Sequence, residues 1–298
     1  MVLRLVDAPW SKIRNLDRKG LIEAIKLSDG RTIAAEVVVT AKPLVDKISN
    51  LEIAAGFGAD MIILNFYDVN LKKIEGIPPE IKTLKQLRDF LGRIVGLNLE
   101  PVKEDIAKEL GYTPGRLATP ENAKKAVEDG ADFLVITANP MAKVTLEDII
   151  KATEEIRNEI GDKALILAGK MHLAGVYGEA LTPKLIKKFA EAGADGILIP
   201  APGTVPGITV EIAKKLVDEA HKNDLLVMST IGTSQEGTDE FTIRQIGLLS
   251  KMTGADIHHI GDSGYSSSVA MPENIMAYSI VIRGKRHTYR RIAMSIMR

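Results

Sequence analysis

Residues 58–64, Gly58-Ala59-Asp60-Met61-Ile62-Ile63-Leu64, form the first of four copies of one short phrase. The other three copies are Gly130-Ala131-Asp132 before Phe-Leu-Val-Ile, Gly193-Ala194-Asp195 before Gly-Ile-Leu-Ile, and Gly254-Ala255-Asp256 before Ile-His-His-Ile. Three copies follow a stretch with helical spacing of apolar residues, so each predicts a helix end, a tight turn and a buried strand. Such alternation is typical of an α/β barrel.

Eight apolar segments have the length and composition of buried strands, and eight is the number that closes this type of barrel. They cover residues 36–41, 61–66, 94–99, 133–137, 164–169, 196–199, 225–229 and 257–260. We therefore predict an α/β fold, a (β/α)8 TIM barrel in a single domain, residues 1–298. Residues 1–32 are an N-terminal extension and residues 33–298 the barrel. A helical segment at 11–27 is expected to cover the bottom of the barrel.

Helix start signals fall after the predicted strands, as a βα repeat requires. Thr119-Pro120 and Thr182-Pro183 each place a capping hydroxyl before a proline at the first helical position. Thr145 followed by Asp148 resembles a capping box.

Composition excludes several classes of function. Of 298 residues, 45% are hydrophobic, and Lys plus Arg and Asp plus Glu both number 39, so no net field attracts nucleic acid or anionic lipid. The absence of cysteine excludes disulfides, thiolate catalysis and zinc-thiolate sites. No apolar run is long enough for a membrane span. We expect a cytoplasmic protein with no nucleic-acid or membrane partner.

Catalytic groups of a TIM barrel lie at the C-terminal ends of its strands, so we searched the residues that follow each strand. The catalytic candidates are Lys42, Glu100, Lys170 and His172. Because strand side chains alternate between faces, Asn98 with Glu100, Thr137 with Asn139, and Lys170 with His172 are each predicted to share a face. A lysine there can form a Schiff base, hold an anion as a point charge, or pair with Glu100 or Asp68. His172 is the preferred general acid or base.

A phosphate site is predicted in the loops after strands seven and eight, residues 229–238 and 261–268. Both loops are rich in glycine and hydroxyl side chains, and these loops commonly cradle phosphate in this fold. The candidate substrate-binding residues are Asn65, Asp68, Asn98, Asn139, Ser229, Thr230, Gly232, Thr233, Asp262, Ser263 and Gly264. The expected partner is a small phosphorylated metabolite.

The adjacent pair His258-His259 has the appearance of a metal motif. Neighbouring strand residues point to opposite faces, so one of the two histidines faces the lumen and the other faces the helices. The spacing gives no dedicated ligand motif, so we expect no required cofactor. A divalent cation held by Glu100, Asp262 and His259 is the alternative.

The basic C-terminal run Arg283, Lys285, Arg286, His287, Arg290 and Arg291 lies beyond a helix opened by Pro272-Glu273. Apolar residues interleave with these charges, so a solvated helix face or a subunit contact in a homo-oligomer is favoured over nucleic-acid binding.

The Gly-Ala-Asp strand openings and the loops after strands seven and eight resemble those of the ribulose-phosphate-binding barrel superfamily. Four segments resemble more closely a bacterial barrel family of unknown function: residues 58–61, 65–70, 115–122 and 255–262. The resemblance covers nearly the whole chain and implies the barrel fold, but it transfers no established catalytic residue.

Members of that family are often labelled haloacid dehalogenase-like hydrolases. The sequence does not support the label, because that enzyme class requires an Asp-x-Asp-x-Thr pattern after a first strand. The nearest fragment, residues 27–32, lacks the nucleophile. Indole-glycerol-phosphate synthases carry Glu-x-Lys on strand one, where this chain has Thr40-Ala41-Lys42. Epimerases of the class place His and Asp metal ligands where this chain has Asn65, Asn98 and Ser229.

The leading hypothesis is therefore a lyase, aldolase or isomerase acting on a small phosphorylated metabolite. In it Lys170 or Lys42 stabilises an enolate-like intermediate, and His172 or Glu100 moves the proton. The alternatives are a non-catalytic metabolite-binding or assembly protein, and a metal-dependent hydrolase that uses Glu100, Asp262 and one histidine.

Overall fold

A computed structural model describes residues 3–172 and 179–298, and within them eight parallel strands form a closed barrel in chain order. The strands are β1 (Thr32–Val38), β2 (Met61–Asn65), β3 (Ile94–Leu99), β4 (Phe133–Ile136), β5 (Leu165–Gly169), β6 (Gly196–Pro200), β7 (Leu226–Ile231) and β8 (Ile257–Ile260). β1 pairs with both β2 and β8, which closes the barrel. The predicted TIM-barrel fold is confirmed.

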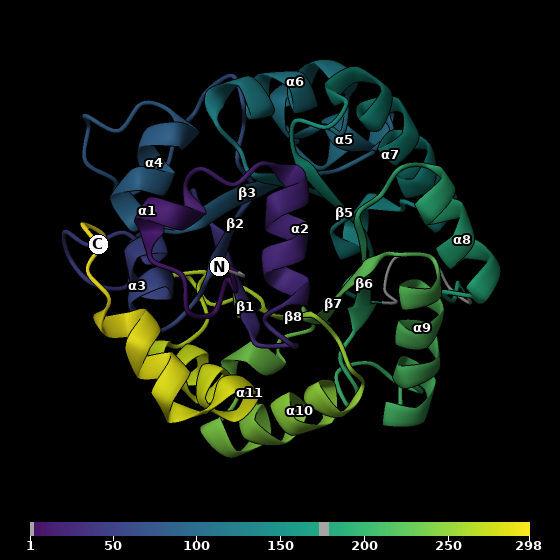
Figure 1. Ribbon diagram of the computed structural model, residues 1–298. Helices are drawn as coiled ribbons and strands as arrows, with labels where there is room; N and C mark the ends of the chain where they lie inside the picture. Colours follow the sequence, from purple (N-terminus) through teal and green to yellow (C-terminus); the bar gives the residue numbers. More distant parts are fainter. Residues whose placement is uncertain (1–2, 173–178) are drawn as a thin grey trace.

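Helices surround the strands in a ring (Figure 1). The ring contains α3 (Asn50–Gly56), α4 (Leu84–Leu91), α5 (Glu104–Glu109), α6 (Pro120–Asp129), α7 (Leu146–Ile160), α8 (Pro183–Glu191), α9 (Val210–Lys222), α10 (Glu240–Met252) and α11 (Pro272–Ala293). Two further helices, α1 (Trp10–Ile13) and α2 (Arg18–Lys26), precede the barrel. Short 3-10 turns η1 (Pro114–Arg116), η2 (Pro140–Ala142) and η3 (Gln235–Gly237) lie in the loops.

The apolar core has two layers. Outward-facing strand residues such as Ile62 and Val227 pack against the ring of helices. Inward-facing residues such as Met61 and Met228 fill the lumen and join a cluster that includes Trp10 and Ile25 of the N-terminal helices. Figure 1 shows α2 lying across this end of the barrel. The expected cover over the bottom is therefore present, with a break between α1 and α2.

The structure explains the fourfold phrase residue by residue. Each glycine has a positive φ, between 85° and 118°, which a side chain would strain. Each alanine is buried. Each aspartate, at the start of an even-numbered strand, accepts a hydrogen bond from a backbone N–H of the preceding strand. These bonds are Ile33 to Asp60 at 2.8 Å, Val95 to Asp132 at 3.0 Å, Ile166 to Asp195 at 2.8 Å and Val227 to Asp256 at 2.8 Å.

A basic side chain pairs with each of these aspartates. Asp132 contacts Arg88 at 3.0 Å, and Asp256 contacts His221 at 2.9 Å. Asp195 binds both Arg18 and Arg157, at 2.5 and 2.7 Å. Arg18 lies in α2, so this pair attaches the bottom cover to the barrel.

Asp60 is the most deeply buried of the four, and two arginines of α11 contact it. Arg283 lies 2.6 Å and Arg291 2.7 Å from its carboxylate. Burial alone would raise the pKa of Asp60, but the two guanidinium groups outweigh burial and hold it below its usual value. The prediction of a solvated basic face is wrong for these two arginines, because they are buried ion-pair partners within the chain.

The first strand begins earlier than the sequence predicts. β1 covers Thr32–Val38 rather than 36–41, with Ala34 opposite both Met61 and His259. Glu36 is therefore near the C-terminal end of the strand, whereas Thr40 and Lys42 lie in the loop beyond it. The three valines at 37–39 placed the predicted boundary too far along the chain, because Ala34, Ala35 and Glu36 before them carry a weak strand signal.

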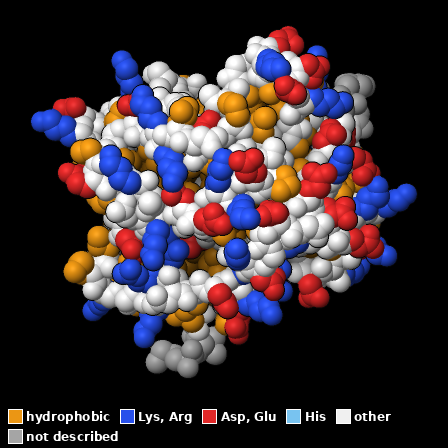
Figure 2. Space-filling view, turned by 90° about the horizontal axis from the view of Figure 1, so that it is seen from above, with side chains coloured by type: hydrophobic (Ala, Val, Ile, Leu, Met, Phe, Trp, Pro, Cys, Tyr) orange, Lys and Arg blue, Asp and Glu red, His pale blue; other side chains and the backbone are white. Residues whose placement is uncertain are grey.

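The predicted helix starts are confirmed. Thr119 caps α6 and Thr182 caps α8, each before a proline at the first turn, and Thr145 with Asp148 forms a complete capping box on α7. No helix among the described residues is long and apolar enough to cross a membrane. Figure 2 views the side on which α6 and α7 lie in Figure 1, and positive and negative side chains are interspersed over it.

We predict that Asp60→Asn lowers the free energy of unfolding by about 3 kcal/mol, because it leaves two buried guanidinium groups without their counter-charge. Asp256→Asn is the matched control. Its partner His221 is partly exposed, so the expected loss is only about 1 kcal/mol. Urea unfolding followed by circular dichroism measures both values. Equal losses in the two variants would show that the arginine pairing adds nothing beyond the shared backbone hydrogen bond.

Candidate active site

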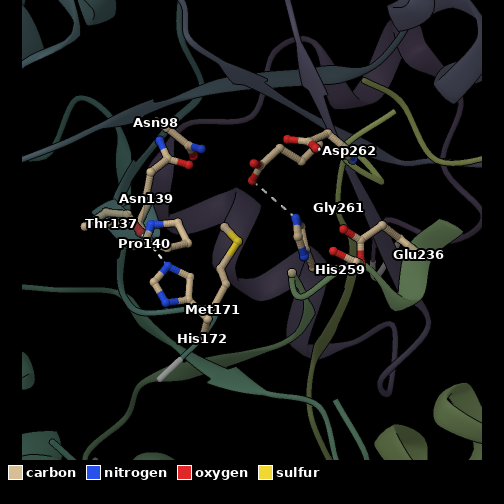
Figure 3. A pocket seen from close by; sticks show the side chains of 15 residues that line it. Asn98, Thr137, Asn139, Pro140, Met171, His172, Glu236, His259, Gly261 and Asp262 are labelled. Carbon is tan, nitrogen blue, oxygen red and sulfur yellow. Dashed lines mark hydrogen bonds and ion pairs between the residues drawn. The ribbon is translucent and has the colours of Figure 1, made fainter. Parts of the chain in front are cut away.

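A cavity of about 180 Å³ lies within the C-terminal mouth of the barrel (Figure 3). Its polar wall comes from strand ends and from the loops that follow them: Glu36, Asn98, Thr137, Asn139, His172, Ser234, Glu236, His259 and Asp262. Gly232, Gly261, Gly264, Met171, Ala138 and Pro140 complete the wall. The location is the one where TIM-barrel enzymes carry their active sites.

Three carboxylates gather on one side of this cavity around a buried histidine. The Nε2 atom of His259 lies 3.4 Å from Oε2 of Glu36. A dashed line from the His259 ring in Figure 3 marks this pair. Asp262 follows β8, and its Oδ2 accepts a hydrogen bond of 3.3 Å from Asn65. Glu236 lies beside His259 in Figure 3, and His172 lies on the opposite side with Asn139 and Met171. The arrangement places ionisable groups on both sides of one small space.

Several buried polar atoms of the wall have no hydrogen-bond partner within the described part of the chain. They are Glu36 Oε2, Asn98 Oδ1, Thr137 Oγ1, Glu236 Oε2 and both ring nitrogens of His259. A buried polar group without a partner costs folding free energy, so proteins seldom retain several together unless they serve a ligand. These atoms are therefore the groups that the protein leaves available inside the cavity.

Burial and mutual repulsion alter the acidity of two of these carboxyls. Burial raises the pKa of Glu236 to about 7, and the negative charge of Asp262 adds to that rise. Burial also raises the pKa of Asp262, with a further contribution from the charge of Glu36. Near neutral pH Glu236 can therefore both give and take a proton, which suits an acid or base catalyst.

The loop after β7 holds Glu236 in place. Asn274 of α11 donates hydrogen bonds to the carbonyls of Glu236 and Thr238, at 3.0 and 2.7 Å. Gly261 leaves room for the carboxyl group, since a Cβ there would lie 3.3 Å from Glu236 Oε1 and 2.8 Å from the Ile231 carbonyl. Ser234, which borders the cavity, has a φ of 78°, in the left-handed region that non-glycine residues seldom adopt.

The two adjacent histidines point to opposite sides of the strand, as predicted. His259 borders the cavity. His258 faces the helices, where its Nδ1 lies 2.8 Å from the Ser250 hydroxyl and its ring packs edge-on against Tyr278. Burial lowers the pKa of His258 to about 3, so it is a neutral core residue.

The four residues predicted to be catalytic lie in different places. Only His172 borders the cavity, where its Nε2 lies 2.9 Å from the Ala138 carbonyl. Lys170 pairs with Glu179 at 2.5 Å and borders a separate space of about 30 Å³. The prediction that Lys170 and His172 point to the same side is therefore wrong. β5 ends at Gly169, and side chains beyond the end of a strand no longer alternate strictly between its two faces. Lys42 is exposed in the β1–α3 loop.

Glu100 has structural partners on every side. Its carboxylate accepts hydrogen bonds from Tyr112 at 2.6 Å, from Arg116 at 3.2 Å and from the amide groups of Asn139 at 2.9 Å. It does not border the cavity, although Asn98 does. Glu100 instead meets the wall from behind, through Asn139, whereas Thr137 and Asn139 border the cavity together.

The predicted substrate-binding residues divide into two groups. Asn98, Asn139, Gly232, Asp262 and Gly264 border the cavity. The others make contacts within the protein: Asn65 to Asp262, Asp68 to the amides of Asn70, Leu71 and Gly115, Ser229 to Ser250, Thr230 to the Ile199 carbonyl, Thr233 to the Thr204 carbonyl, and Ser263 to the Val269 carbonyl. Ser229 faces α10 because β7 continues to Ile231, so this residue is not at the strand end.

Sequence reasoning missed Glu36, Glu236 and Ser234 as site residues. The misplaced start of β1 put Glu36 at the wrong end of its strand. Glu236 and Ser234 lie within the predicted phosphate loop, residues 229–238, where the content of glycine and hydroxyl side chains indicates an anion site and gives no sign of a carboxylate in the wall. A carboxylate isolated inside an apolar strand segment was the signal that could have identified Glu36, since such residues are seldom buried without a role.

No group of three or more His, Asp or Glu side chains in the described parts of the chain has the geometry to hold a metal ion. The proposed set Glu100, Asp262 and His259 does not assemble, because Glu100 lies in its own network with Tyr112, Arg116 and Asn139.

The family model described as "Domain of unknown function (DUF7916)" matches residues 6–298. The chain belongs to this family. No functionally curated protein matches it in sequence.

Solved structures with a similar barrel include several lyases and aldolases. A putative lyase/mutase from Burkholderia cenocepacia J2315 is 16% identical, with a TM-score of 0.49 and 82% of each chain covered. 2,3-Dimethylmalate lyase, a PEP mutase/isocitrate lyase superfamily member, is 15% identical, with a TM-score of 0.48 and coverage of 82% of this chain and 80% of that chain. Deoxyribose phosphate aldolase from Aeropyrum pernix is 17% identical, with a TM-score of 0.46 and coverage of 88% and 94%. At these values the likeness does not extend to the activity of this chain.

We predict that the Glu236 carboxyl titrates with a midpoint near pH 7, as its pKa indicates. In Asp262→Asn the midpoint moves to lower pH, because the charge that disfavours ionisation of Glu236 is gone. Carbon-13 NMR of glutamate-labelled protein measures the titration, and the resonance absent from Glu236→Gln assigns it. A midpoint at the ordinary glutamate value, or no change in Asp262→Asn, would contradict this description of the site.

Proposed function

We propose that the protein is an enzyme of the lyase or isomerase type that moves a proton on a small polar metabolite bound in the barrel mouth. One observation carries the proposal. A buried imidazole, His259, faces the cavity beside Glu36 and near a second carboxyl, Glu236, whose pKa is close to neutral. Pairs of ionisable groups whose surroundings separate their proton affinities are the usual basis of acid–base catalysis.

The geometry supports a division of roles. His259 accepts a proton from carbon or oxygen of the substrate, and Glu36, 3.4 Å away, stabilises the imidazolium that results. Protonated Glu236 donates its proton to the oxygen on which negative charge develops. Asn98 and Thr137, through their free oxygens, accept hydrogen bonds from substrate hydroxyl or amine groups and fix its orientation.

The phosphorylated substrate stays a prediction, as does membership of the ribulose-phosphate-binding superfamily. Gly232, Ser234 and Gly264 of the two predicted phosphate loops border the cavity. No lysine or arginine among the described residues borders it. A phosphate would therefore depend on backbone amides and on neutral donors such as Ser234 and Asn139, without the lysine or arginine that phosphate sites commonly include.

The proposal is tested by proton exchange in heavy water. The protein is incubated with a panel of three- to six-carbon hydroxy and keto metabolites, each with and without a phosphate group, and deuterium incorporation is followed by proton NMR. We expect exchange with at least one compound, reduced about 100-fold in His259→Asn and in Glu236→Gln. His221→Gln, a change at a partly exposed histidine of α9, is the control and retains the full rate.

Two outcomes would contradict the proposal. A compound that raises the melting temperature without exchange or conversion would identify a metabolite-binding protein. An exchange rate equal in His259→Asn and in the unaltered protein would place the chemistry elsewhere. The exchange rates of each metabolite with and without its phosphate group are compared separately, and this comparison tests the prediction of a phosphorylated substrate.

A further inference from the structure

The charges on the cavity wall have one sign. Glu36, Glu236 and Asp262 border the cavity, whereas no lysine or arginine of the described chain does so. Residues 173–178, which lie outside the description, read Leu-Ala-Gly-Val-Tyr-Gly and contribute no charged side chain. Two histidines are the only other ionisable groups among the bordering residues. The whole chain has zero formal charge, so the excess of carboxylates in the cavity wall does not reflect the overall composition and is specific to this site.

The cations that could neutralise these carboxylates have other partners. Lys170 pairs with Glu179 in the separate small space. Arg116 pairs with Glu100, and its guanidinium lies between the rings of Phe66 and Tyr112, 4.0 Å from each centroid. These two cations therefore serve contacts within the protein, and His259 is the basic group that the described chain places beside the three carboxylates.

We propose that the metabolite bound in this cavity carries a protonated amine, which Glu36 and Asp262 hold by charge and Glu236 holds by a hydrogen bond to its free carboxyl oxygen. The inference rests on the proposed function for the reaction, but it concerns the chemical class of the ligand. It also differs from the predicted phosphorylated metabolite in the sign of the charge that is recognised.

The free acceptors of the wall match what an ammonium group offers. An ammonium group donates up to three hydrogen bonds and accepts none. Glu236 Oε2 is a buried acceptor without a hydrogen bond in the described chain, and Glu36 Oε2 has only the 3.4 Å contact with His259. Asn98 Oδ1 and Thr137 Oγ1 lie in the same wall. A dianionic ligand would meet like charge at three points, which disfavours its binding.

The size of the cavity limits the ligand. Its volume of about 180 Å³ equals that of about six water molecules at about 30 Å³ each. A compound with a short carbon chain, one amine and one or two hydroxyl groups fits this space. The hydroxyl groups would lie toward His172 and Asn139, which face the carboxylates across the cavity in Figure 3.

The test uses compounds that differ chiefly in charge: 2-amino-1,3-propanediol, glycerol, glycerate and glycerol phosphate. Dissociation constants are measured by titration calorimetry or ligand-observed NMR. We expect the amine to bind at least about tenfold more tightly than glycerol, and the two anions more weakly than glycerol. Because Glu236 ionises near pH 7, the affinity for the amine should rise as the pH increases through neutrality.

Variants localise the effect. Glu36→Gln and Asp262→Asn each reduce the preference for the amine over glycerol by about tenfold, while the affinity for glycerol changes little. Glu240→Gln is the matched control, because it removes the same charge from an exposed position on α10, where Glu240 pairs with Arg244. It leaves the preference unchanged. Thermal unfolding of each variant verifies that it is folded.

Three results would overturn the inference: equal binding of amine and glycerol, preferential binding of glycerol phosphate, or tight binding of Mg²⁺ or Mn²⁺ added alone with no amine binding. The last would mean that an inorganic cation neutralises the carboxylates. Failure here is distinguishable from failure of the proposed function. Proton exchange on a compound of the hydroxy and keto panel without any preference for the amine overturns only the proposed class of ligand. Binding of the amine without proton exchange, on the amine itself or on any compound of that panel, overturns only the proposed enzymatic activity.

Discussion

The structure depends on a bond that is repeated around the bottom of the barrel, between an aspartate carboxylate at the start of each even strand and a backbone N–H of the strand before it. A charged acceptor makes this bond stronger than one between neutral groups. Each bond also fixes the register of two neighbouring strands, because the aspartate N–H simultaneously donates to the carbonyl of the same residue, as with Asp60 and Ile33 or Asp195 and Ile166. Four such clamps join the strands in pairs, and closure of the barrel joins the pairs.

Because these aspartate bonds lie at the bottom of the barrel, the residues that stabilise each strand pair are at one end of the strands and the residues of the cavity are at the other end. Five residues after the four aspartates, at the opposite end of the barrel, the chain has Asn65, Thr137, Pro200 and Gly261. These positions are structurally equivalent but chemically unrelated. Because the four aspartates and their basic partners fix the bottom of the barrel, side chains at the top can vary without loss of register. The cavity wall can therefore contain unpartnered polar atoms whose cost the clamped end offsets.

The sequence predicted the parts of this molecule that follow from local pattern. Repeated turns, capping residues and apolar runs identified all eight strands, and alternation correctly predicted that one of His258 and His259 faces the lumen. The errors arose where local pattern ends. The register of β1 is set by its pairing with β2 and β8, which no signal within 32–41 encodes. Lys170 lies just beyond its strand, and Glu100 finds partners from 12 to 39 residues away, so tertiary contacts alone decide their roles.

The apolar filling of the lumen accounts for the chemistry of its mouth. Met61, Ile63, Leu167 and Met228 belong to the cluster inside the barrel, which the N-terminal helices cover from the other end. Carboxyl groups above such a floor lose hydration on one side, and burial is accordingly the largest cause of the raised pKa of both Glu236 and Asp262. A floor of polar residues would return these groups to ordinary acidity and leave no proton donor near neutral pH. The covered, apolar lower barrel is thus as necessary to the proposed proton transfer as the side chains that carry it out.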